Sequence, residues 1–547
     1  MTRPQTDFDQ MHPLLSAEIQ ADYRRKGHWQ DQNLAMLVES WADRDPNRIA
    51  VTGELRLSYQ DVWDRARRVA GVLRAQGLEE GESLLAVLPN SWQGVVLEVA
   101  ASVLGVCFVP RSTQITPTLA LNVFDQLNVR GIVLSSALLS QPEWVRVLNV
   151  MSGSLTGRPI MLLRSGENDG FDFDDIEVAS TNGPLAERVP FRRCRPSLVL
   201  STGGSTGLPK SIVHCSESLI YAARHFGQDS DYSERDVHVS FLPYGHAAGS
   251  LFEIYMPFLF GASVLPLNRW QVEPVVKAIQ KWGGTYFITM GTHIFDMLTM
   301  DPELRGCLAS IRLLVTGAGP DSLFIEAERE LGVKMVRDYG FSECPGHALG
   351  RTSDSSTARL NQDGIPFTGM STRILDPATG DLARIGHAGE YQCMGPNLFM
   401  GYAGLAELTQ SAITDDGFYI SGDLMAETAD GYITWKGRTK DIIRRGGLQI
   451  DAIELESMLD THPKIANVVV VGEPDPRLGE KAVIVAVPAS NEDLPRLEEL
   501  CKFLTDLGVE KQSLPERLVV MDALPRTELG KFHRIEVQRL LNELGSS

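Results

Sequence analysis

A glycine-rich run in the middle of the chain carries the residue types that hold phosphate groups. It reads Ser201-Thr202-Gly203-Gly204-Ser205-Thr206-Gly207-Leu208-Pro209-Lys210. Glycines let backbone N–H groups approach phosphate oxygens closely, the hydroxyls add donors, and the lysine adds positive charge. On composition alone, a glycine-rich surface loop is the alternative. The run predicts a site for the phosphates of a nucleotide.

The run differs from the phosphate-binding loop of P-loop NTPases. That loop has the pattern G-x-x-x-x-G-K-[ST], and Gly204 could begin it with Lys210-Ser211 at its end. Pro209, however, stands where the pattern needs its second glycine. Proline removes a backbone donor and fixes φ, so we exclude a P-loop NTPase.

Further short motifs follow the run in the sequence. Thr316-Gly317-Ala318-Gly319-Pro320 follows a predicted strand, and Tyr339-Gly340-Phe341-Ser342-Glu343 offers a ring, a hydroxyl and a carboxylate. A ring supplies a stacking face, and Mg²⁺ takes one or two carboxylates. Tyr419-Ile420-Ser421-Gly422-Asp423, Gly437-Arg438 and Leu524-Pro525-Arg526-Thr527-Glu528-Leu529-Gly530-Lys531 complete the series. Taken singly, each of these side chains is better explained by the core or the surface.

Together and in this order, the motifs resemble those of the adenylate-forming superfamily of acyl-CoA synthetases, peptide-synthetase adenylation domains and luciferases. Within it, the chain is most similar to cyclohexanecarboxylate and aryl-acid ligases. Two residues depart from the usual run, Gly203 in place of serine and Ser211 in place of glycine. The resemblance covers the chain from about Leu57 to Arg534.

The resemblance implies ATP-dependent activation of a carboxylic acid, with ATP, Mg²⁺ and CoA, or the phosphopantetheine of a carrier protein, as cofactors. It implies catalytic roles for Lys531, Glu343 and Thr202, with Glu343 as the Mg²⁺ ligand, Tyr339 stacked on adenine, and Asp423 with Arg438 on the ribose. The nucleotide-binding set that it implies is Ser201, Thr202, Gly203, Gly204, Ser205, Thr206, Gly207, Lys210, Gly317, Ala318, Gly319, Pro320, Asp338, Tyr339, Gly340, Phe341, Ser342, Asp423, Arg438 and Lys531.

In the same family the small C-terminal domain rotates between two half-reactions. The resemblance implies that Lys531 bridges the carboxylate and the phosphate in the first, and that Lys440 is the hinge. In the second, a thiol attacks the adenylate, and the loop Arg444-Arg445-Gly446-Gly447 would line the thiol tunnel.

The segment Leu242 to Gly249 corresponds to the family's acid pocket. His246 holds the aromatic position, and Ala247 follows where α-amino-acid activating domains carry an aspartate and dihydroxybenzoate ligases an asparagine. An ammonium or phenol would lose its partner here, and unpaired buried polar groups are costly. We therefore expect an apolar, non-amino acid that is alicyclic, aryl, terpenoid or medium-chain. The expected pocket residues are Tyr244, His246, Ala247, Gly249, Met290, Gly291 and Gly340.

Strand and helix patterns alternate along the chain, which favours an α/β architecture with helix-covered sheets. Apolar residues at helical spacing predict a helix that ends at Gly77, and short apolar runs predict strands at 83–88, 106–109 ending at Pro110, and 198–200. The last 110 or so residues predict a small α+β domain with its own strands and helices. The predicted domains are 1–438, for ATP and the acid, and 439–547, which is mobile and carries Lys531.

Composition limits the partners. The chain has 547 residues and a net charge of −19, which argues against nucleic acid and anionic membrane surfaces. Seven scattered cysteines without a Cys-x-x-Cys suit a reducing cytoplasm. We see no secretory h-region and no apolar run of the ~20 residues that span a bilayer. The oligomeric state stays open, with a homodimer among the alternatives.

Three functional hypotheses follow. The leading one is an acyl-CoA synthetase that performs both half-reactions. The second is an acyl-AMP ligase that passes the acyl group to a carrier protein or partner enzyme. The third is a nucleotide-binding sensor without catalysis, against which the presence of Lys531, Glu343 and Asp423 argues.

Overall fold

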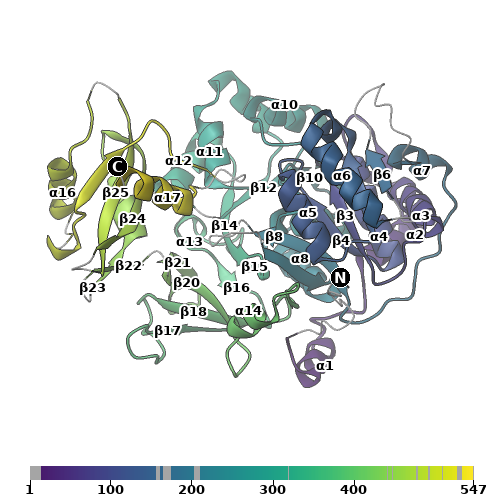
Figure 1. Cartoon of the computed structure of the whole chain (residues 1–547), viewed down its shortest axis with the longest axis horizontal. Helices are drawn as coiled ribbons and strands as arrows, with labels where there is room; N and C mark the ends of the chain where they lie inside the picture. Colours follow the sequence, from purple (N-terminus) through teal and green to yellow (C-terminus); the bar gives the residue numbers. More distant parts are fainter. Residues whose placement is uncertain are drawn as a thin grey trace. The chain divides into compact units, whose positions relative to one another are not determined.

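The fold places two large sheets next to the predicted site segments, and both can be followed in Figure 1. The computed structural model describes residues 14–155, 160–163, 174–202, 210–317, 319–439, 442–445, 448–475, 479–490, 493–507, 509, 511–526 and 532–545. These residues form two units, the first made of 14–202, 210–371 and 394–418 and the second of 372–393 and 419–545. Each unit is described below by itself.

In the first unit, one sheet carries the predicted phosphate strand. Its described strands, in spatial order, are β19 (Gly401–Tyr402), β9 (Lys210–Cys215), β8 (Pro196–Thr202), β4 (Cys107–Arg111), β3 (Ser83–Val87), β5 (Gly131–Ser135), β6 (Ile160–Leu163) and β7 (Asp174–Asp175). The strands from β8 to β7 are parallel to one another, whereas β9 and β19 run antiparallel to their neighbours. Helices α5 (Pro117–Gln126) and α6 (Pro142–Ser154) cover one face with a buried apolar core.

A second sheet of the same unit carries the acid-pocket and adenine segments. Its described strands, in spatial order, are β16 (Ile365–Pro366), β15 (Cys344–Leu349), β14 (Met335–Phe341), β13 (Leu313–Thr316), β12 (Tyr286–Thr289), β10 (Val237–Ser240), β11 (Ser263–Pro266), β1 (Ile49–Val51) and β2 (Leu57–Ser58). The strands from β14 to β1 are parallel. Segments that leave the carboxyl ends of these strands therefore gather along one edge, where ligands bind in open α/β sheets.

Helices connect and cover the strands of both sheets. Those described in the first unit, besides α5 and α6, are α1 (Ala17–Arg25), α2 (Leu34–Arg44), α3 (Tyr59–Ala75), α4 (Trp92–Leu104), α7 (Ile176–Asn182), α8 (Ser216–Asp229), the π-helix η3 (Ala248–Tyr255), α9 (Met256–Phe260), α10 (Val272–Trp282), α11 (Gly291–Thr299), α12 (Asp321–Leu331), α13 (Ser356–Asn361), α14 (Ala406–Ser411) and the 3₁₀ helices η2 (Ser136–Ser140) and η4 (Pro302–Leu308). The predicted helix before Gly77 is α3. Its capping box joins Ser58 and Asp61, since the Asp61 N–H donates to Ser58 Oγ at 3.1 Å and the Ser58 N–H to Asp61 Oδ2 at 2.8 Å.

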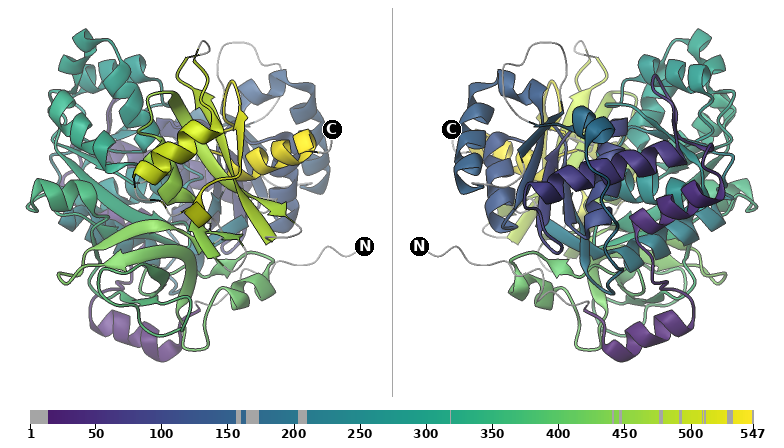
Figure 2. Two further views of the ribbon diagram at one scale, coloured as in Figure 1. Left: turned by 90° about the vertical axis from the view of Figure 1, so that its left-hand side faces the viewer. Right: turned by 90° about the vertical axis from the view of Figure 1, so that its right-hand side faces the viewer.

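The second unit contains two smaller sheets. The first, in spatial order, consists of β17 (Ser371–Leu375), β18 (Gly389–Met394), β20 (Tyr419–Glu427) and β21 (Ile433–Arg438). The other consists of β23 (Leu448–Asp451), β22 (Ile442–Arg445), β25 (Gly479–Pro488), β24 (Ile465–Asp475) and, beside β25, β26 (Arg517–Val520). Helices α15 (Ala452–Leu459) and α16 (Leu497–Asp506) pack on one face of this last sheet and α17 (Arg534–Gly545) on the other, as Figure 2 shows.

The observed elements confirm the predicted α/β class with a smaller α+β part at the end of the chain. The strand predicted at 106–109 is β4, which begins one residue later and continues through Pro110 to Arg111. The Pro110 carbonyl stays engaged, since it accepts a hydrogen bond from Arg111 Nη1 at 2.8 Å. The predicted boundary at residues 438–440 falls between the two sheets of the second unit and stays a prediction.

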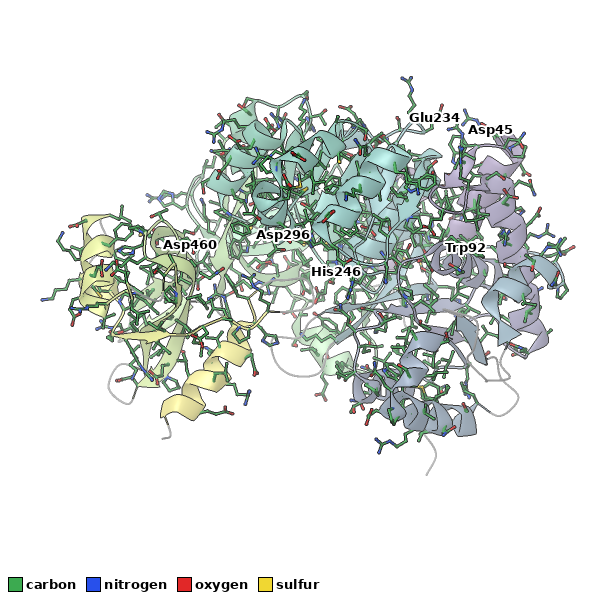
Figure 3. The ribbon with its side chains drawn as sticks, turned by 90° about the horizontal axis from the view of Figure 1, so that it is seen from above. Asp45, Trp92, Glu234, His246, Asp296 and Asp460 are labelled. Carbon is green, nitrogen blue, oxygen red and sulfur yellow. The ribbon has the colours of Figure 1, made fainter. Side chains whose placement is uncertain are left out.

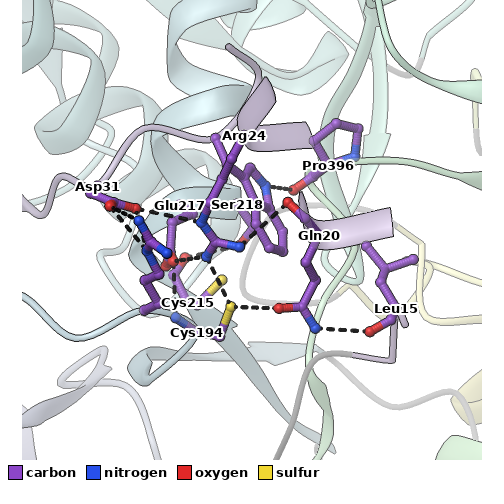
Figure 4. A network of polar contacts seen from close by, with 11 residues as sticks. Leu15, Gln20, Arg24, Asp31, Cys194, Cys215, Glu217, Ser218 and Pro396 are labelled. Atoms are coloured by element: carbon purple, nitrogen blue, oxygen red, sulfur yellow. Dashed lines mark hydrogen bonds and ion pairs between the residues drawn. The ribbon is translucent and has the colours of Figure 1, made fainter. Parts of the chain in front are cut away.

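The N-terminal segment is fixed to the rest of the first unit by a polar network, shown in Figure 4. Arg24 of α1 forms an ion pair with buried Glu217 at 3.1 Å, and the same carboxylate accepts the Cys194 N–H at 2.9 Å. Trp29 donates its indole N–H to the Pro396 carbonyl at 2.8 Å. The segment before α2 is therefore tied both to the start of α8 and to the turn that precedes β19.

No helix in the described part of the chain is long and apolar enough to cross a membrane.

Candidate active site

The described ends of the predicted phosphate run are Ser201 and Thr202, the last residues of β8, and Lys210, the first residue of β9. Strands β8 and β9 pair in antiparallel fashion, with Ser201 opposite Ser211 and Thr202 opposite Lys210. The Ser201 N–H donates to the Gly245 carbonyl at 3.0 Å, which joins this strand to the predicted acid-pocket segment. Residues 203–209, which include Gly203, Gly204, Ser205, Thr206 and Gly207, lie outside the described residues.

Tyr402 links the lysine of this run to the predicted magnesium ligand. The Lys210 ammonium lies 4.8 Å from the centre of the Tyr402 ring, and the Tyr402 hydroxyl donates to Glu343 Oε1 at 2.6 Å. The pairing of β19 with β9, which sets Tyr402 opposite Ile212, brings the three side chains together. A cation on a ring face and a short bond to a carboxylate are both favourable. Tyr402 is not among the predicted site residues.

The turn that carries Glu343 is fixed by buried side chains. Asn397 donates from Nδ2 to the carbonyls of Pro345 and Gly346, both at 3.0 Å. His214 Nε2 donates to the Ser342 carbonyl at 2.8 Å, and burial lowers the pKa of His214 to about 4, so the ring is neutral near pH 7. These partners come from β9 and from the segment after β18, and only the fold brings them to this turn.

Strand β14 carries the predicted adenine residue Tyr339 near its carboxyl end, and the predicted α-phosphate residue Ser342 follows in the next turn. Tyr339 is buried, and its ring packs edge-to-face against the rings of Phe341 and His347, with distances between ring centres of 5.8 and 5.9 Å. A Cβ on Gly340 would lie 2.9 Å from the Gly346 backbone nitrogen, so this position of β14 requires glycine. Strands β13 and β14 thus place Gly317 near Asp338, since a Cβ on Gly317 would lie 3.6 Å from Asp338 Oδ1.

The remaining residues predicted on the adenine turn lie around the start of α12. Gly319 packs on this helix, because a Cβ there would be 2.6 Å from the Phe324 ring. Pro320 precedes α12 directly, whereas Ala318 lies outside the described residues. The turn is thus fixed at its end by apolar packing.

The predicted acid-pocket segment leads into the π-helix η3, and Figure 3 labels its His246. His246 is half-buried, and its Nδ1 accepts the Ala248 N–H at 3.2 Å. Because Nδ1 acts as acceptor, the proton of the neutral ring belongs on Nε2. Ala247 is buried, and a Cβ on Gly249 would lie 2.1 Å from the Pro243 carbonyl oxygen. A π-helix is rare and often marks a functional site.

The buried carboxyl groups of Glu253 and Glu98 hydrogen-bond to the acid-pocket segment or to the residues next to it. Glu253 accepts the N–H groups of Phe241 and Leu242 at 3.2 and 3.1 Å. The Ser250 hydroxyl lies 2.7 Å from the Tyr244 carbonyl and 3.2 Å from Glu98 Oε2. Burial raises the pKa of Glu98 to about 8 and that of Glu253 well above its usual range, so both favour the neutral form.

The other predicted pocket residues lie at two further places. The Tyr244 ring is buried against α4, since a Cβ on Gly94 would be 3.0 Å from it. Met290 and Gly291 are half-buried at the start of α11, where the Met290 N–H donates to His293 Nδ1 at 3.1 Å. Which of these residues contact the acid stays a prediction.

In the second unit, the two predicted ribose ligands form an ion pair. Strands β20 and β21 set Asp423 opposite Arg438, and Arg438 Nε lies 2.8 Å from Asp423 Oδ1. The same oxygen accepts the Trp435 indole N–H at 3.2 Å, and the Thr439 hydroxyl donates to the Gly422 carbonyl at 2.7 Å. The carboxylate is almost fully buried, with its side chain 2% exposed, and its orientation is therefore fixed.

Several residues predicted from the resemblance are outside the described residues, namely Lys531, Lys440, Gly446 and Gly447. Arg444 lies on β22, and Arg445, beside it, forms an ion pair with Glu516. Their proposed roles stay predictions.

Comparison with known proteins agrees with this arrangement. The model of the AMP-binding enzyme family matches residues 38–403, and the model of the AMP-binding enzyme C-terminal domain matches 454–531. The chain belongs to the AMP-binding enzyme family, which confirms the resemblance to adenylate-forming enzymes.

Individual relatives match over nearly the whole chain. It is 28% identical to the medium-chain fatty-acid–CoA ligase of Escherichia coli strain K12 over 530 residues, 96% of this chain and 93% of that protein. It is 29% identical to the pyochelin synthase PchD of Pseudomonas aeruginosa strain UCBPP-PA14 over 544 residues, 95% of each. The ATP-bound crystal structure of MatB from Rhodopseudomonas palustris has the same fold, with a TM-score of 0.84 at 23% identity over 94% of this chain and 100% of that one.

Proposed function

We propose that this protein activates a carboxylic acid with ATP through an acyl-adenylate and then transfers the acyl group to the thiol of CoA. The arrangement of Lys210, Tyr402 and Glu343 carries the proposal, because it sets a cation and a carboxylate beside the strand that leads into the phosphate run. The paired Asp423 and Arg438 support it, since a fixed carboxylate suits the two hydroxyls of a ribose.

The first step joins the acid to the nucleotide. A carboxylate oxygen of the acid attacks the α-phosphorus of ATP, the bond to the bridging oxygen breaks, and pyrophosphate leaves. Negative charge then develops on the α-phosphate and on both the attacking and leaving oxygens, so the step needs cations and donors that are already in place. We assign Lys210 to the outer phosphates and Lys531 to the carboxylate and α-phosphate.

The residues around Glu343 fit a magnesium ion. Among the described residues, Tyr402 alone hydrogen-bonds this carboxylate, through Oε1, which leaves Oε2 available to a cation. One or two carboxylates with retained waters is the usual protein contribution to Mg²⁺. When bound, the ion would neutralise phosphate charge, while Tyr402 and the backbone bond from Phe399 N to the Glu343 carbonyl, at 2.8 Å, hold the residue in position.

For the acid, we propose an apolar alicyclic, aryl, terpenoid or medium-chain compound. Ala247 supplies neither a carboxylate for an ammonium group nor an amide for a phenol. His246, with its proton on Nε2, offers a neutral donor at the segment instead. The medium-chain fatty-acid–CoA ligase among the relatives supports an apolar acid.

In the second step, the thiol attacks the carbonyl carbon of the adenylate and AMP leaves. We propose free CoA as the acceptor, supported by relatives that are named CoA ligases. The alternative is a carrier protein or partner enzyme, which relatives named as synthase components leave open. We further propose that the C-terminal domain rotates about Lys440 between the steps, with Arg444 to Gly447 lining the thiol path.

ATP–pyrophosphate exchange with a panel of apolar, aryl and amino acids, with and without CoA, tests the function. Exchange with an apolar acid and an acyl-CoA product by mass are expected, whereas absence of exchange with every acid would favour a non-catalytic nucleotide sensor. Exchange that stops at the adenylate despite CoA would favour the carrier-protein alternative.

The variant Lys531→Ala tests the division of labour between the two steps. It should lose adenylation but still transfer the acyl group from a supplied adenylate to CoA. Equal loss of both steps would contradict the domain rotation.

A further inference from the structure

Arg111, the last residue of β4, is a buried cation without a carboxylate partner among the described residues. It is 5% exposed. Its Nη1 donates to the carbonyls of Pro110 at 2.8 Å and Val199 at 3.0 Å, while its Nε is buried and makes no hydrogen bond to the described chain. Burial lowers the pKa of Arg111 to about 10, and the guanidinium therefore stays charged at neutral pH.

A buried charge of this kind calls for a counter-charge. Buried arginines elsewhere in this unit have one, as Arg337 has in Asp363 at 2.7 Å. An unpaired buried cation is costly, so proteins pair such groups or use them for a ligand. The Nε and Nη2 edge of a guanidinium is the fork that binds two oxygens of a phosphate or carboxylate, and Nε of Arg111 makes no hydrogen bond to a described residue.

The strand register places this cation next to the phosphate run. Phe108 of β4 pairs with Leu198 of β8 in parallel, and the same register, continued three residues along both strands, sets Arg111 beside Ser201. Val109 and Val199 belong to the same core cluster, and side chains two residues apart on a strand share a face. Arg111 and Ser201 therefore point to the same face, at the carboxyl edge where ligands bind in such sheets.

A second cation lies on the other side of the same strand. In the order β9, β8, β4, Lys210 begins β9 and Arg111 ends β4, so the backbones of these two residues lie on either side of the end of β8. Lys210 pairs with Thr202 and not with Ser201, so its side chain leaves the opposite face of the sheet from that of Arg111. The backbone of Gly245 packs directly against the end of β4, since a Cβ on Gly245 would lie 2.7 Å from the Pro110 carbonyl oxygen and 3.3 Å from the Arg111 Cα. Because the whole chain carries a net charge of −19, local cations at this point matter for an anionic reactant.

We propose that Arg111 binds an oxyanion of the triphosphate of ATP and, after adenylation, of pyrophosphate. The assignment rests on the proposed use of ATP. A carboxylate has the same recognition chemistry, so the acid is the other source of such an oxyanion. The neighbouring Ser201, which opens the phosphate run, favours the phosphate.

Calorimetric titration of the full chain with magnesium pyrophosphate and with magnesium ATP tests the proposal. Arg111→Met removes the charge at similar length, and Arg111→Lys keeps the charge without the fork. Arg130, directly before β5 at the opposite edge of the same sheet, provides the control variant Arg130→Met. Loss of a bond to a charged group should weaken pyrophosphate binding about 10- to 100-fold in Arg111→Met, with a smaller loss in Arg111→Lys and none in the control.

Each outcome separates this proposal from the one on which it rests. If the wild-type chain binds neither ATP nor pyrophosphate, the proposed function fails. If the wild type binds both and Arg111→Met binds them equally well, the Arg111 assignment is overturned, as it is if the loss appears only in the KM for the acid. Thermal unfolding of each variant shows whether it is folded. If Arg111→Met is not folded, the binding measured with Arg111→Lys decides the test.

Discussion

Removal of one oxygen, in Tyr402→Phe, tests whether Tyr402 positions the magnesium ligand. The Tyr402 hydroxyl lies 2.6 Å from Glu343 Oε1, whereas the ring that carries the Lys210 ammonium remains in the variant. A hydrogen bond to a charged group contributes about 1.5 to 3 kcal/mol. If the transition state needs the carboxylate in this position, the rate should fall by about 10- to 100-fold, at 1.4 kcal/mol for each factor of ten.

The assay is ATP–pyrophosphate exchange measured against magnesium concentration. A positioning role predicts a lower maximal rate and a higher magnesium requirement, because Glu343 then samples other rotamers. Tyr402→Leu should lose more, since it also removes the ring beneath Lys210, an interaction of about 0.5 to 2 kcal/mol.

A matched control separates this effect from a general loss of stability. Tyr59 is also fully buried, and its hydroxyl donates to the Ala262 carbonyl at 2.8 Å. Tyr59→Phe should lower the unfolding midpoint by about as much as Tyr402→Phe does, but it should leave the rate of ATP–pyrophosphate exchange unchanged. Exchange in Tyr402→Phe within twofold of wild type at every magnesium concentration would refute the reasoning.

Two further predictions concern the support of the acid-pocket segment. The pKa of Glu98 is about 8 in the fold against 4.5 in the unfolded chain, so the folded state keeps its proton between these values and wild type loses stability as pH rises through them. Glu98→Gln should therefore be more stable than wild type at pH 8.5 and similar at pH 4.5, by chemical unfolding at both; an unchanged pH dependence would contradict the burial argument. Gly249→Ala, whose Cβ would meet the Pro243 carbonyl at 2.1 Å, should cost about 2 to 4 kcal/mol of unfolding free energy. Gly153→Ala, where a Cβ would have no atom within 4 Å, should raise the free energy of unfolding by about 1 kcal/mol or less. If both variants changed the free energy of unfolding equally, the space around the Cβ would not explain the loss in Gly249→Ala.

The family and the α/β class could be predicted from the sequence because the motifs are local. The phosphate run, Tyr339 to Glu343, and Tyr419 to Asp423 each need only the order and types of consecutive residues. Periodicity likewise predicted α3, and Ser58 with Asp61 three residues later fixes its start locally. Such signals are complete within a few residues, so no tertiary structure is needed to recognise them.

The partners of these motifs could not be predicted, since they come from distant parts of the chain. Tyr402 is 59 residues from Glu343, and the two meet because β19 adds to the edge of the sheet beside β9. Asn397 is 52 residues from the Pro345 carbonyl that it holds. A tyrosine or asparagine in isolation gives no sign of such a role, because its partner is selected by strand pairing.

The sequence by itself determined which chemistry the chain carries, since the residue types and their order define a nucleotide-binding, acid-activating family. Only the tertiary structure decided how the charges are arranged around that chemistry. Arg111 is an ordinary residue after a predicted strand until the register sets it beside Ser201 and burial deprives it of solvent. Burial and pairing across strands are properties of the whole fold, and they turn a charged side chain into a site for an anion.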